Sequence, residues 1–219
     1  MDLSGLIRSI DWYWLETTAM RLFAVLLCLT VHETCHGLAA CALGDPTARD
    51  RHRLSLNPLR HIDWLGFAMM LFAGFGWAKP VPVDPRYFKK PKQGMALTAL
   101  AGPASNLLLA LLAMLFCHKV LDGLVTSEAG FGYVLYIFLH LFLAPLSIGL
   151  GLFNLLPIPP LDGAKVLGAF LPDRVYFGLM RYERYGMLLL LALSWFGLTG
   201  DLISGAIQGV YQFFLELCL

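Results

Sequence analysis

The sequence predicts an all-α polytopic membrane protein, with about 4–6 membrane-embedded helices and a short re-entrant β-hairpin or loop. Hydrophobic residues make up 58% of the chain and charged residues only 14%, whereas a soluble domain carries about 25% charged residues. Four long apolar stretches run along the chain, and a proline-containing apolar segment lies between the first two. Together these observations indicate a chain that is built into a bilayer.

The first three apolar stretches are long enough to cross a bilayer, because a crossing helix needs about 20 residues. They cover 17–43, 95–117 and 131–156. The fourth stretch, 186–200, is short by that measure and is followed by Asp201. The residues after Asp201 are apolar again, and three interpretations stay open for them: a further crossing, a continuation after a kink, or an interfacial helix.

We expect a single membrane-embedded domain over residues 1–219, because no internal repeat, low-complexity run or linker divides the chain. Residues 1–16 should form an interfacial N-terminal segment. Its Trp-Tyr-Trp run at 12–14 is typical of the aromatic belt at a membrane surface. Residues 201–219 should form a C-terminal helix.

An unusual segment, 63–84, lies between the first two stretches. Residues 64–76 are apolar but too few to cross the membrane as a helix. Pro80 and Pro82 alternate with valines after them, which favours extended backbone over helix. Irregular backbone at membrane depth persists only against protein or a water-filled cavity. We therefore expect a re-entrant loop or hairpin that covers a site; the alternative is an interfacial loop with aromatic anchors.

Basic residues gather on one side of the predicted topology. The net charge is only +1, so nothing indicates a nucleic-acid partner. If the first three stretches cross, thirteen of the sixteen Lys and Arg residues fall in 44–94 and 157–185, on the same side of the membrane. The positive-inside rule makes that side cytoplasmic and places the N-terminus outside.

The first stretch contains His-Glu-Thr-Cys-His at positions 32–36. His32 and His36 share one face of a helix, so both can bind one metal ion. Glu33 beside them can take a proton from a metal-bound water. Ionisable groups are costly in hydrocarbon, so this cluster indicates a hydrolytic metal site within the bilayer. The alternative is a histidine pair that neighbouring helices satisfy by hydrogen bonding.

A catalytic zinc usually takes three protein ligands and keeps one open position, so a third ligand is needed. Cys28 is excluded because it lies about 12 Å from His36 along the helix axis. Asp162 is the better candidate, since it follows the proline-rich end of the third stretch on the same predicted side as His36. The alternatives are an ordinary turn in which this aspartate caps the next helix, or His52 and His61 as ligands.

Two asparagines in apolar surroundings are candidates for contacts with a substrate or an oxyanion. The amide of Asn106 can bond a substrate carbonyl or an oxyanion, or it can join two helices. Asn154 can hold the turn of Asp162 or hydrogen-bond a ligating histidine. His140 has no motif around it, and we expect it to be packed or hydrogen-bonded rather than catalytic.

Three segments together resemble the signature motifs of the site-2 protease family of intramembrane zinc metallopeptidases. They are Val-His-Glu-Thr-Cys-His-Gly at 31–37, Ala-Gly-Pro-Ala-Ser-Asn at 101–106 and Asn-Leu-Leu-Pro-Ile-Pro-Pro-Leu-Asp-Gly at 154–163. The likeness extends over about 22–167 and is to the small bacterial and archaeal type without PDZ or CBS domains. Asn106 and Asn154 match family positions near the active site.

The resemblance implies an intramembrane zinc metalloprotease that holds one Zn²⁺ per chain. His32, His36 and Asp162 are the implied zinc ligands, and Glu33 is the implied catalytic base acting on a zinc-bound water. The implied substrates are membrane proteins, cut within or near their transmembrane segments. The segment around Pro80 and Pro82 is implied to pair with an unwound stretch of substrate.

The resemblance to a bacterial and archaeal type implies a prokaryotic cell membrane. The composition predicts an integral protein in contact with the lipid bilayer, and the count of basic residues places the histidine motif, in the second half of the first stretch, toward the cytoplasm. Two other functions stay open. One is a catalytically inactive scaffold that binds transmembrane helices, and the other is a metal transporter. The single metal motif and the lack of a repeat argue against a transporter.

Overall fold

The computed structural model describes residues 11–73, 76–121, 130–181, 185–186, 188–190, 192 and 198–219. These residues are mostly helical and form no sheet. Within them, three helical runs are long and apolar enough to cross a membrane. They are Trp12–Ala42, Pro91–Leu121 and Phe131–Asn154. The predicted all-α membrane protein is thus confirmed.

The first crossing is the helix α2 (Trp12–Ala42). Asp11 caps its N-terminus by accepting a hydrogen bond from the backbone N–H of Trp14 at 3.0 Å. The helix therefore begins inside the segment that the sequence assigned to the interface, and residues 1–10 lie outside the described part of the chain. Trp12 and Tyr13 are exposed at this end, as an interfacial belt requires.

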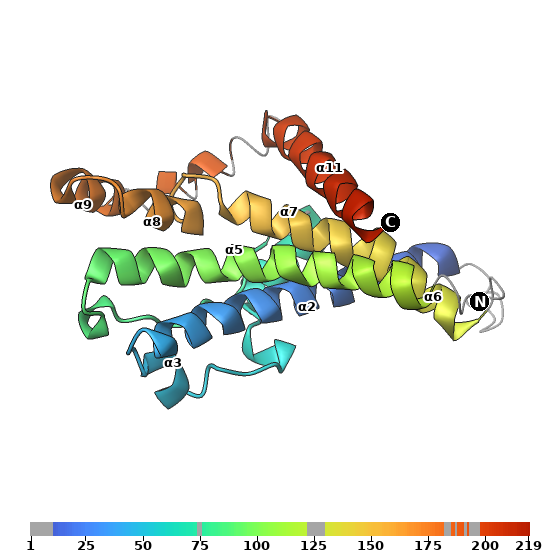
Figure 1. Ribbon diagram of the computed structural model, residues 1–219, viewed down its shortest axis with the longest axis horizontal. Coiled ribbons are helices and arrows are strands. Elements are labelled where there is room, and N and C mark those ends of the chain that lie inside the picture. Colours follow the sequence, from blue (N-terminus) through green and yellow to red (C-terminus); the bar gives the residue numbers. More distant parts are fainter. Residues whose placement is uncertain are drawn as a thin grey trace, which may run out of the picture.

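The second and third crossings each contain a π-helical turn. The helix α5 (Pro91–Phe116) continues into the turn η3 (Cys117–Leu121). The third run comprises α6 (Phe131–Ile137), the turn η4 (Phe138–Leu143) and α7 (Ala144–Asn154). In Figure 1, α5 and the third run lie side by side along the length of the molecule, and α2 lies against α5.

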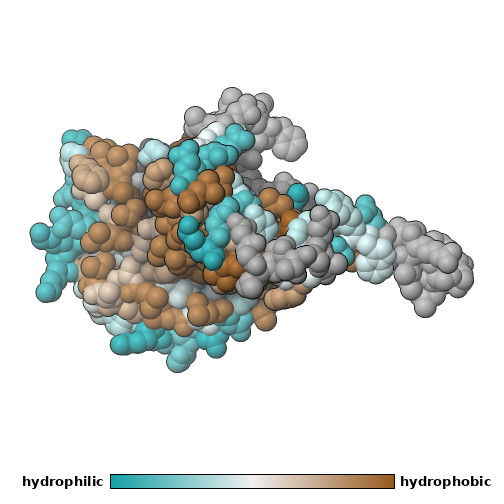
Figure 2. All heavy atoms as spheres, turned by 45° about the vertical axis from the view of Figure 1, so that its right-hand side comes forward, coloured by the Kyte–Doolittle hydropathy of each residue, from teal (hydrophilic) through white to brown (hydrophobic). Residues whose placement is uncertain are grey.

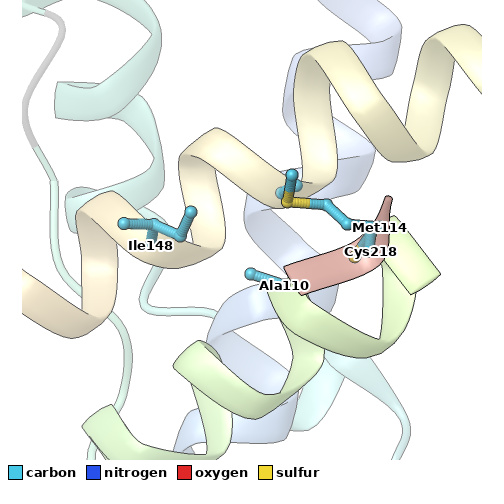
Figure 3. Close-up of a cluster of buried hydrophobic side chains, with 5 residues drawn as sticks. Ala110, Met114, Ile148 and Cys218 are labelled. Atoms are coloured by element: carbon cyan, nitrogen blue, oxygen red, sulfur yellow. The ribbon is translucent and has the colours of Figure 1, made fainter. Parts of the chain in front are cut away.

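Small residues let these helices pack closely. Ala110 and Ala144 are fully buried between α5 and α7, as expected where helix association depends on close backbone approach. Met114 of α5 and Ile148 of α7 fill the space beside them, and Figure 3 shows Cys218 reaching the same cluster from the end of the C-terminal helix. This core holds the C-terminal helix on α7.

The C-terminal helix α11 (Leu198–Cys218) runs without a break through Asp201. It begins before this aspartate rather than after it. Most of the predicted fourth stretch, 186–200, lies outside the described residues.

The segment 63–84 is a short helix followed by an extended loop. The helix α4 (Trp64–Ala73) is too short to cross. From Gly76 to Asp84 the chain forms no helix, and one antiparallel bridge pairs Ile62 with Ala78. Because Pro80 and Pro82 favour extended backbone, we call this stretch the extended loop. The N–H of Lys79 donates to the carbonyl of His61 at 2.8 Å beside this bridge. The sequence predicted a re-entrant loop or a hairpin here. The described residues form a loop with a single bridge and no hairpin.

The polar connections lie at one end of the helical body. In Figure 1, α3 (Thr47–Asp50), α8 (Asp162–Gly168) and α9 (Asp173–Arg181) all lie at the end where α5 begins. Lys92 joins these connections, because its Nζ donates to the Asp173 carboxylate at 2.9 Å and to the carbonyl of Leu171. The two basic loops of the sequence are therefore on the same side, as three crossings require.

The outer surface of the helical body is apolar. Figure 2 shows brown, hydrophobic side chains over much of the visible face, with teal, hydrophilic ones at its end and lower edge. On α5 alone, large side chains that face outward are Leu97, Leu100, Leu108, Leu112 and Phe116. An exposed apolar surface of this extent fits hydrocarbon rather than water.

Candidate metal centre

Three side chains from opposite parts of the chain converge on one point. His32 Nε2 and His36 Nε2 lie 2.9 Å apart, and Asp162 Oδ2 lies 3.2 Å from the first and 3.1 Å from the second. All three residues are buried. Donor atoms around a tetrahedral zinc with bonds of ~2.0–2.1 Å are about 3.3 Å apart. The three atoms can therefore hold one metal ion after a small adjustment.

The ring of His36 is oriented by a backbone group of α5. Its Nδ1 lies 2.7 Å from the carbonyl oxygen of Thr98. A carbonyl only accepts, so Nδ1 must carry the hydrogen, and Nε2 of the neutral ring keeps its lone pair toward the shared point. This is the tautomer that a metal ligand needs.

The ring of His32 is oriented by Asn106, which is fully buried in α5. The amide Nδ2 of Asn106 lies 3.3 Å from His32 Nδ1, and its Oδ1 has no hydrogen-bond partner among the described residues. The two ends of an amide are assigned from their partners and exchange by a half-turn of the side chain. With Oδ1 facing the ring, Asn106 accepts from Nδ1–H and leaves the lone pair of His32 Nε2 free to bind a metal ion.

Asp162 is placed by the tight turn that precedes α8. A side chain at Gly163 would put its Cβ 2.1 Å from the carbonyl oxygen of Leu155, so only glycine permits this close approach. Asp162 is the first residue of α8, and the N-cap is Leu161, with no side-chain capping bond. The alternative of an N-capping aspartate therefore does not describe this residue.

The charge of the Asp162 carboxyl is set by opposing effects. Burial raises its pKa, but the contacts with the imidazoles of His32 and His36 and the positive charge of Lys165 outweigh burial and hold the pKa below its usual range. The Nζ of Lys165 lies 3.5 Å from Oδ1, the oxygen that does not face the histidines. Asp162 is therefore ionised, as a metal ligand must be.

Gly102 makes room for both imidazoles, a role that its residue type did not reveal in the sequence. A Cβ at this position of α5 would lie 2.4 Å from His36 Cε1 and 2.7 Å from His32 Cε1. The two rings therefore rest against bare backbone of α5. The Gly-Pro-Ala-Ser-Asn run contributes to the site twice, through this glycine and through Asn106.

Gly102→Ala should weaken zinc binding by about 10- to 100-fold, the range that supporting residues of metal ligands commonly show. The new methyl group forces the rings away from the shared point, since the well-packed core gives way only at a cost. Zinc affinity of the purified protein, measured by chelator competition, checks this. Gly209→Ala on α11 is the control, because a Cβ there meets nothing within 4 Å. Equal zinc affinity in both variants would contradict the prediction.

Glu33 points to the same region but does not belong to the donor group. Its Oε2 accepts a hydrogen bond from the backbone N–H of Val81 at 2.8 Å. Val81 is buried in the extended loop that follows α4. The loop thus lies against the motif helix α2, which favours a cover over the site and not a free interfacial loop.

A cavity of about 790 Å³ adjoins these residues. Its wall is mainly apolar and includes His32, Glu33, His36 and Asp162. The lining residues come from α2, α4, α5, α7, α8, α11 and the extended loop, among other segments. Asn154 also lines the cavity, and its Nδ2 donates to the carbonyl of Leu150 at 2.9 Å. Asn106 is not part of the wall, so the two asparagines differ in access to a bound molecule.

Other residues considered as ligands or catalysts lie elsewhere. Cys28 lines the cavity but is not in the donor group. His61 is buried, with Nε2 2.7 Å from the carbonyl oxygen of Ser55. His140 lies 2.7 Å from the hydroxyl of Tyr211 through its Nε2, so the expectation that it is hydrogen-bonded is confirmed. Among the described residues, His32, His36 and Asp162 form the one group of three such side chains close enough to share an ion.

Comparison with known proteins agrees with this geometry. Residues 20–194 match the profile described as "Peptidase family M50", which covers the histidine motif, the asparagines and Asp162. The chain belongs to peptidase family M50. This is the site-2 protease family that its motifs resemble, and no PDZ or CBS domain is evident in the sequence.

Two similar relatives of this M50 peptidase span most of its length. It is 37% identical over 186 residues to "Putative zinc metalloprotease YwhC" of Bacillus subtilis, which is 83% of this chain and 83% of that protein. It is 30% identical over 199 residues to "Putative zinc metalloprotease Rip2" of Mycobacterium tuberculosis, which is 88% of this chain and 71% of that protein. No solved structure matches the chain.

Family membership and the buried donor group lead to the same conclusion. The M50 peptidase is a zinc metalloprotease and a membrane protein, with apolar helices long enough to cross the bilayer. Its donor set, two imidazoles and one carboxylate, is one that catalytic zinc takes while it keeps a position open for chemistry.

Proposed function

We propose that this M50 peptidase is an intramembrane protease that cuts peptide bonds within or near transmembrane segments of membrane proteins. The observation that carries the proposal is the position of the donor group. His32, His36 and Asp162 line an apolar cavity bounded by all three helical runs that can cross the membrane. A peptide held in that cavity meets the reactive groups inside the bilayer.

In this proposal His32, His36 and Asp162 hold the zinc ion, with Thr98 and Asn106 fixing the tautomers of the two rings. The bound ion supplies Lewis acidity toward the scissile carbonyl and acidifies water. Glu33 is the general base: it takes a proton from the attacking water and passes it to the leaving amine. Val81 uses only one oxygen of this carboxylate, Oε2, so the second oxygen remains to accept the proton.

The substrate must be locally unwound before it is cut, because the carbonyls of a helix are already hydrogen-bonded and shielded. The extended backbone at 76–84 offers main-chain groups with which an unwound strand can pair. Asn154 lines the cavity and is the candidate for substrate contact. Asn106 lies behind His32, so we assign it to positioning that ring rather than to the oxyanion.

We place the site toward the cytoplasm of a prokaryotic cell membrane. The helices α3, α8 and α9, which belong to the two basic loops, lie at the end of the molecule where α5 begins, and basic loops face the cytoplasm. Asp162 and Thr98 belong to that same end, so water reaches the cavity from the cytoplasmic surface.

A comparison of membrane proteomes tests this function. Cells that carry the parental protein and cells that carry Glu33→Gln are compared for full-length and truncated membrane proteins. In cells that carry the variant, we expect uncleaved single-span proteins to accumulate. Fragments with new termini near a transmembrane segment should occur only in cells that carry the parental protein. Identical proteomes, together with no cleavage of transmembrane peptides by the purified parent, would leave a helix-binding scaffold. Zinc uptake into proteoliposomes would instead identify a transporter.

A further inference from the structure

The extended loop touches Glu33 through a backbone group. The N–H of Val81 donates to Glu33 Oε2 at 2.8 Å. On either side of it stand Pro80 and Pro82, which have no N–H. Val81 is therefore the one residue of this Pro-Val-Pro run that can donate from its backbone, and that donor faces the carboxylate.

The part of the loop that precedes Val81 is held by contacts other than the hydrogen bond to Glu33. The guanidinium of Arg53 donates to the carbonyl of Lys79 at 2.9 Å and to that of Pro80 at 3.3 Å. The same guanidinium donates to the carbonyl of Arg60 at 2.6 Å. One side chain thus ties the loop, just before Val81, to the neighbouring connection.

The other side of the loop is tied by Asp45, whose side chain is fully buried. Its Oδ2 accepts from the backbone N–H of Asp84 at 2.7 Å, and its Oδ1 accepts from the backbone N–H of Thr47 at 2.9 Å. Buried carboxylates bound by several donors hold fixed positions. The loop is thereby anchored to the residues that follow α2.

The side chain of Val81 adds a third anchor on α2 itself. A Cβ at Gly37 would lie 3.1 Å from Val81 Cγ1 and 2.4 Å from Leu54 Cδ2. Gly37 is one helical turn beyond Glu33, on the same face. The bare backbone at this glycine lets Val81 approach α2 closely enough for its N–H to reach the carboxylate.

From these contacts we infer that Val81 is a positioning residue: its backbone N–H holds the carboxylate of Glu33 in the orientation needed for proton transfer. The inference rests on the proposed role of Glu33 as general base. A base that is itself oriented by another group is a recurring arrangement, and a displacement of about 1 Å can cost about 100-fold in rate. The loop that is proposed to pair with the substrate strand therefore also orients the carboxylate of the general base, Glu33.

The test compares Val81→Pro with Val81→Ala. Both variants lose the valine side chain, but only proline loses the N–H, and the extended run between prolines accommodates it. With a purified protein and a transmembrane peptide substrate, we expect kcat of V81P to fall about 10- to 100-fold below that of V81A. The KM values of the two should agree within about two-fold, and both should bind zinc at the parental stoichiometry.

Equal kcat values in V81P and V81A would overturn the inference while leaving the proposed function intact. A higher KM of V81P than of V81A, with the same kcat, would also overturn it. If V81P loses zinc or does not fold, an ester bond at position 81 replaces it. This change puts 2-hydroxy-3-methylbutanoic acid in place of valine, so an ester oxygen replaces the N–H and the valine side chain is kept. The ester also weakens the carbonyl of Pro80 as an acceptor for Arg53, but the shorter bond from Arg53 to Lys79 is unchanged, and the same fall in kcat relative to the parent is expected. Inactivity of the zinc-loaded parent would instead contradict the proposed function.

Discussion

Glu33→Gln should abolish peptide hydrolysis and leave zinc binding intact. Glutamine has the size of glutamate, and its amide oxygen can still accept the N–H of Val81. It cannot take a proton from water, so the general-base contribution of about 100- to 10,000-fold is lost. The measurements are kcat on a transmembrane peptide and the zinc content of the same purified sample. The donor group contains no atom of Glu33, so the zinc content should not change.

The matched control is Glu216→Gln, the same chemical change at an exposed position of α11. It should cleave at the parental rate. If E33Q cleaves as fast as E216Q, Glu33 is not the base. If E33Q loses zinc as well as activity, Glu33 supports the metal and the division of roles between Glu33 and the donor group is wrong.

The helices and the histidine pair could be predicted because their signals are local. The crossings follow from apolar length alone, and α2 begins only a few residues from the expected start. His32 and His36 meet because four residues along a helix return to the same face. Tertiary packing adjusts their rings through Thr98 but does not decide that they meet.

The prediction of Asp162 as the third member of the donor group depended on the membrane topology as well as on local sequence. Asp162 lies 130 residues from His32 in sequence, and no local pattern joins them. Two further crossings, Pro91–Leu121 and Phe131–Asn154, lie between the end of α2 and Asp162. Two crossings return the chain to the side where α2 ends, and the proline-rich turn ends the last of them before Asp162. That argument predicts that His32 and Asp162 lie at a similar depth in the membrane. It does not predict the distance of 3.2 Å between His32 Nε2 and Asp162 Oδ2, which depends on how Gly163 packs against Leu155.

The contacts that sequence reasoning missed are made by backbone or by the absence of a side chain. The carbonyl of Thr98 and the N–H of Val81 exist at almost every position of a chain, so residue type carries no sign of them. A glycine in an apolar helix is typical of close helix packing, but the rings that pack against Gly102 belong to the donor group. Asn106 could be chosen as a candidate from its amide group alone. Its direction toward His32 depends on the contact between α2 and α5.

Asp162→Asn should weaken zinc binding by more than about 100-fold, beyond the loss typical of residues that only support ligands. The amide keeps the shape of the carboxylate but not its charge, and zinc sites in proteins use Asp or Glu oxygen rather than neutral amides. Activity should fall with zinc occupancy and recover in part when zinc is added in excess. Glu33→Gln should show no such recovery, because its zinc site is full.

Asp173→Asn is the control for this variant, since it makes the same change at the first residue of the next helix, α9. Asp173 forms an exposed ion pair with Lys92, and such pairs contribute about 0–1 kcal/mol, so its zinc affinity should equal that of the parent. Parental zinc affinity in D162N would remove Asp162 from the donor group. Two histidines alone would then have to hold the ion, and the link between the third crossing and the chemistry in α2 would be lost.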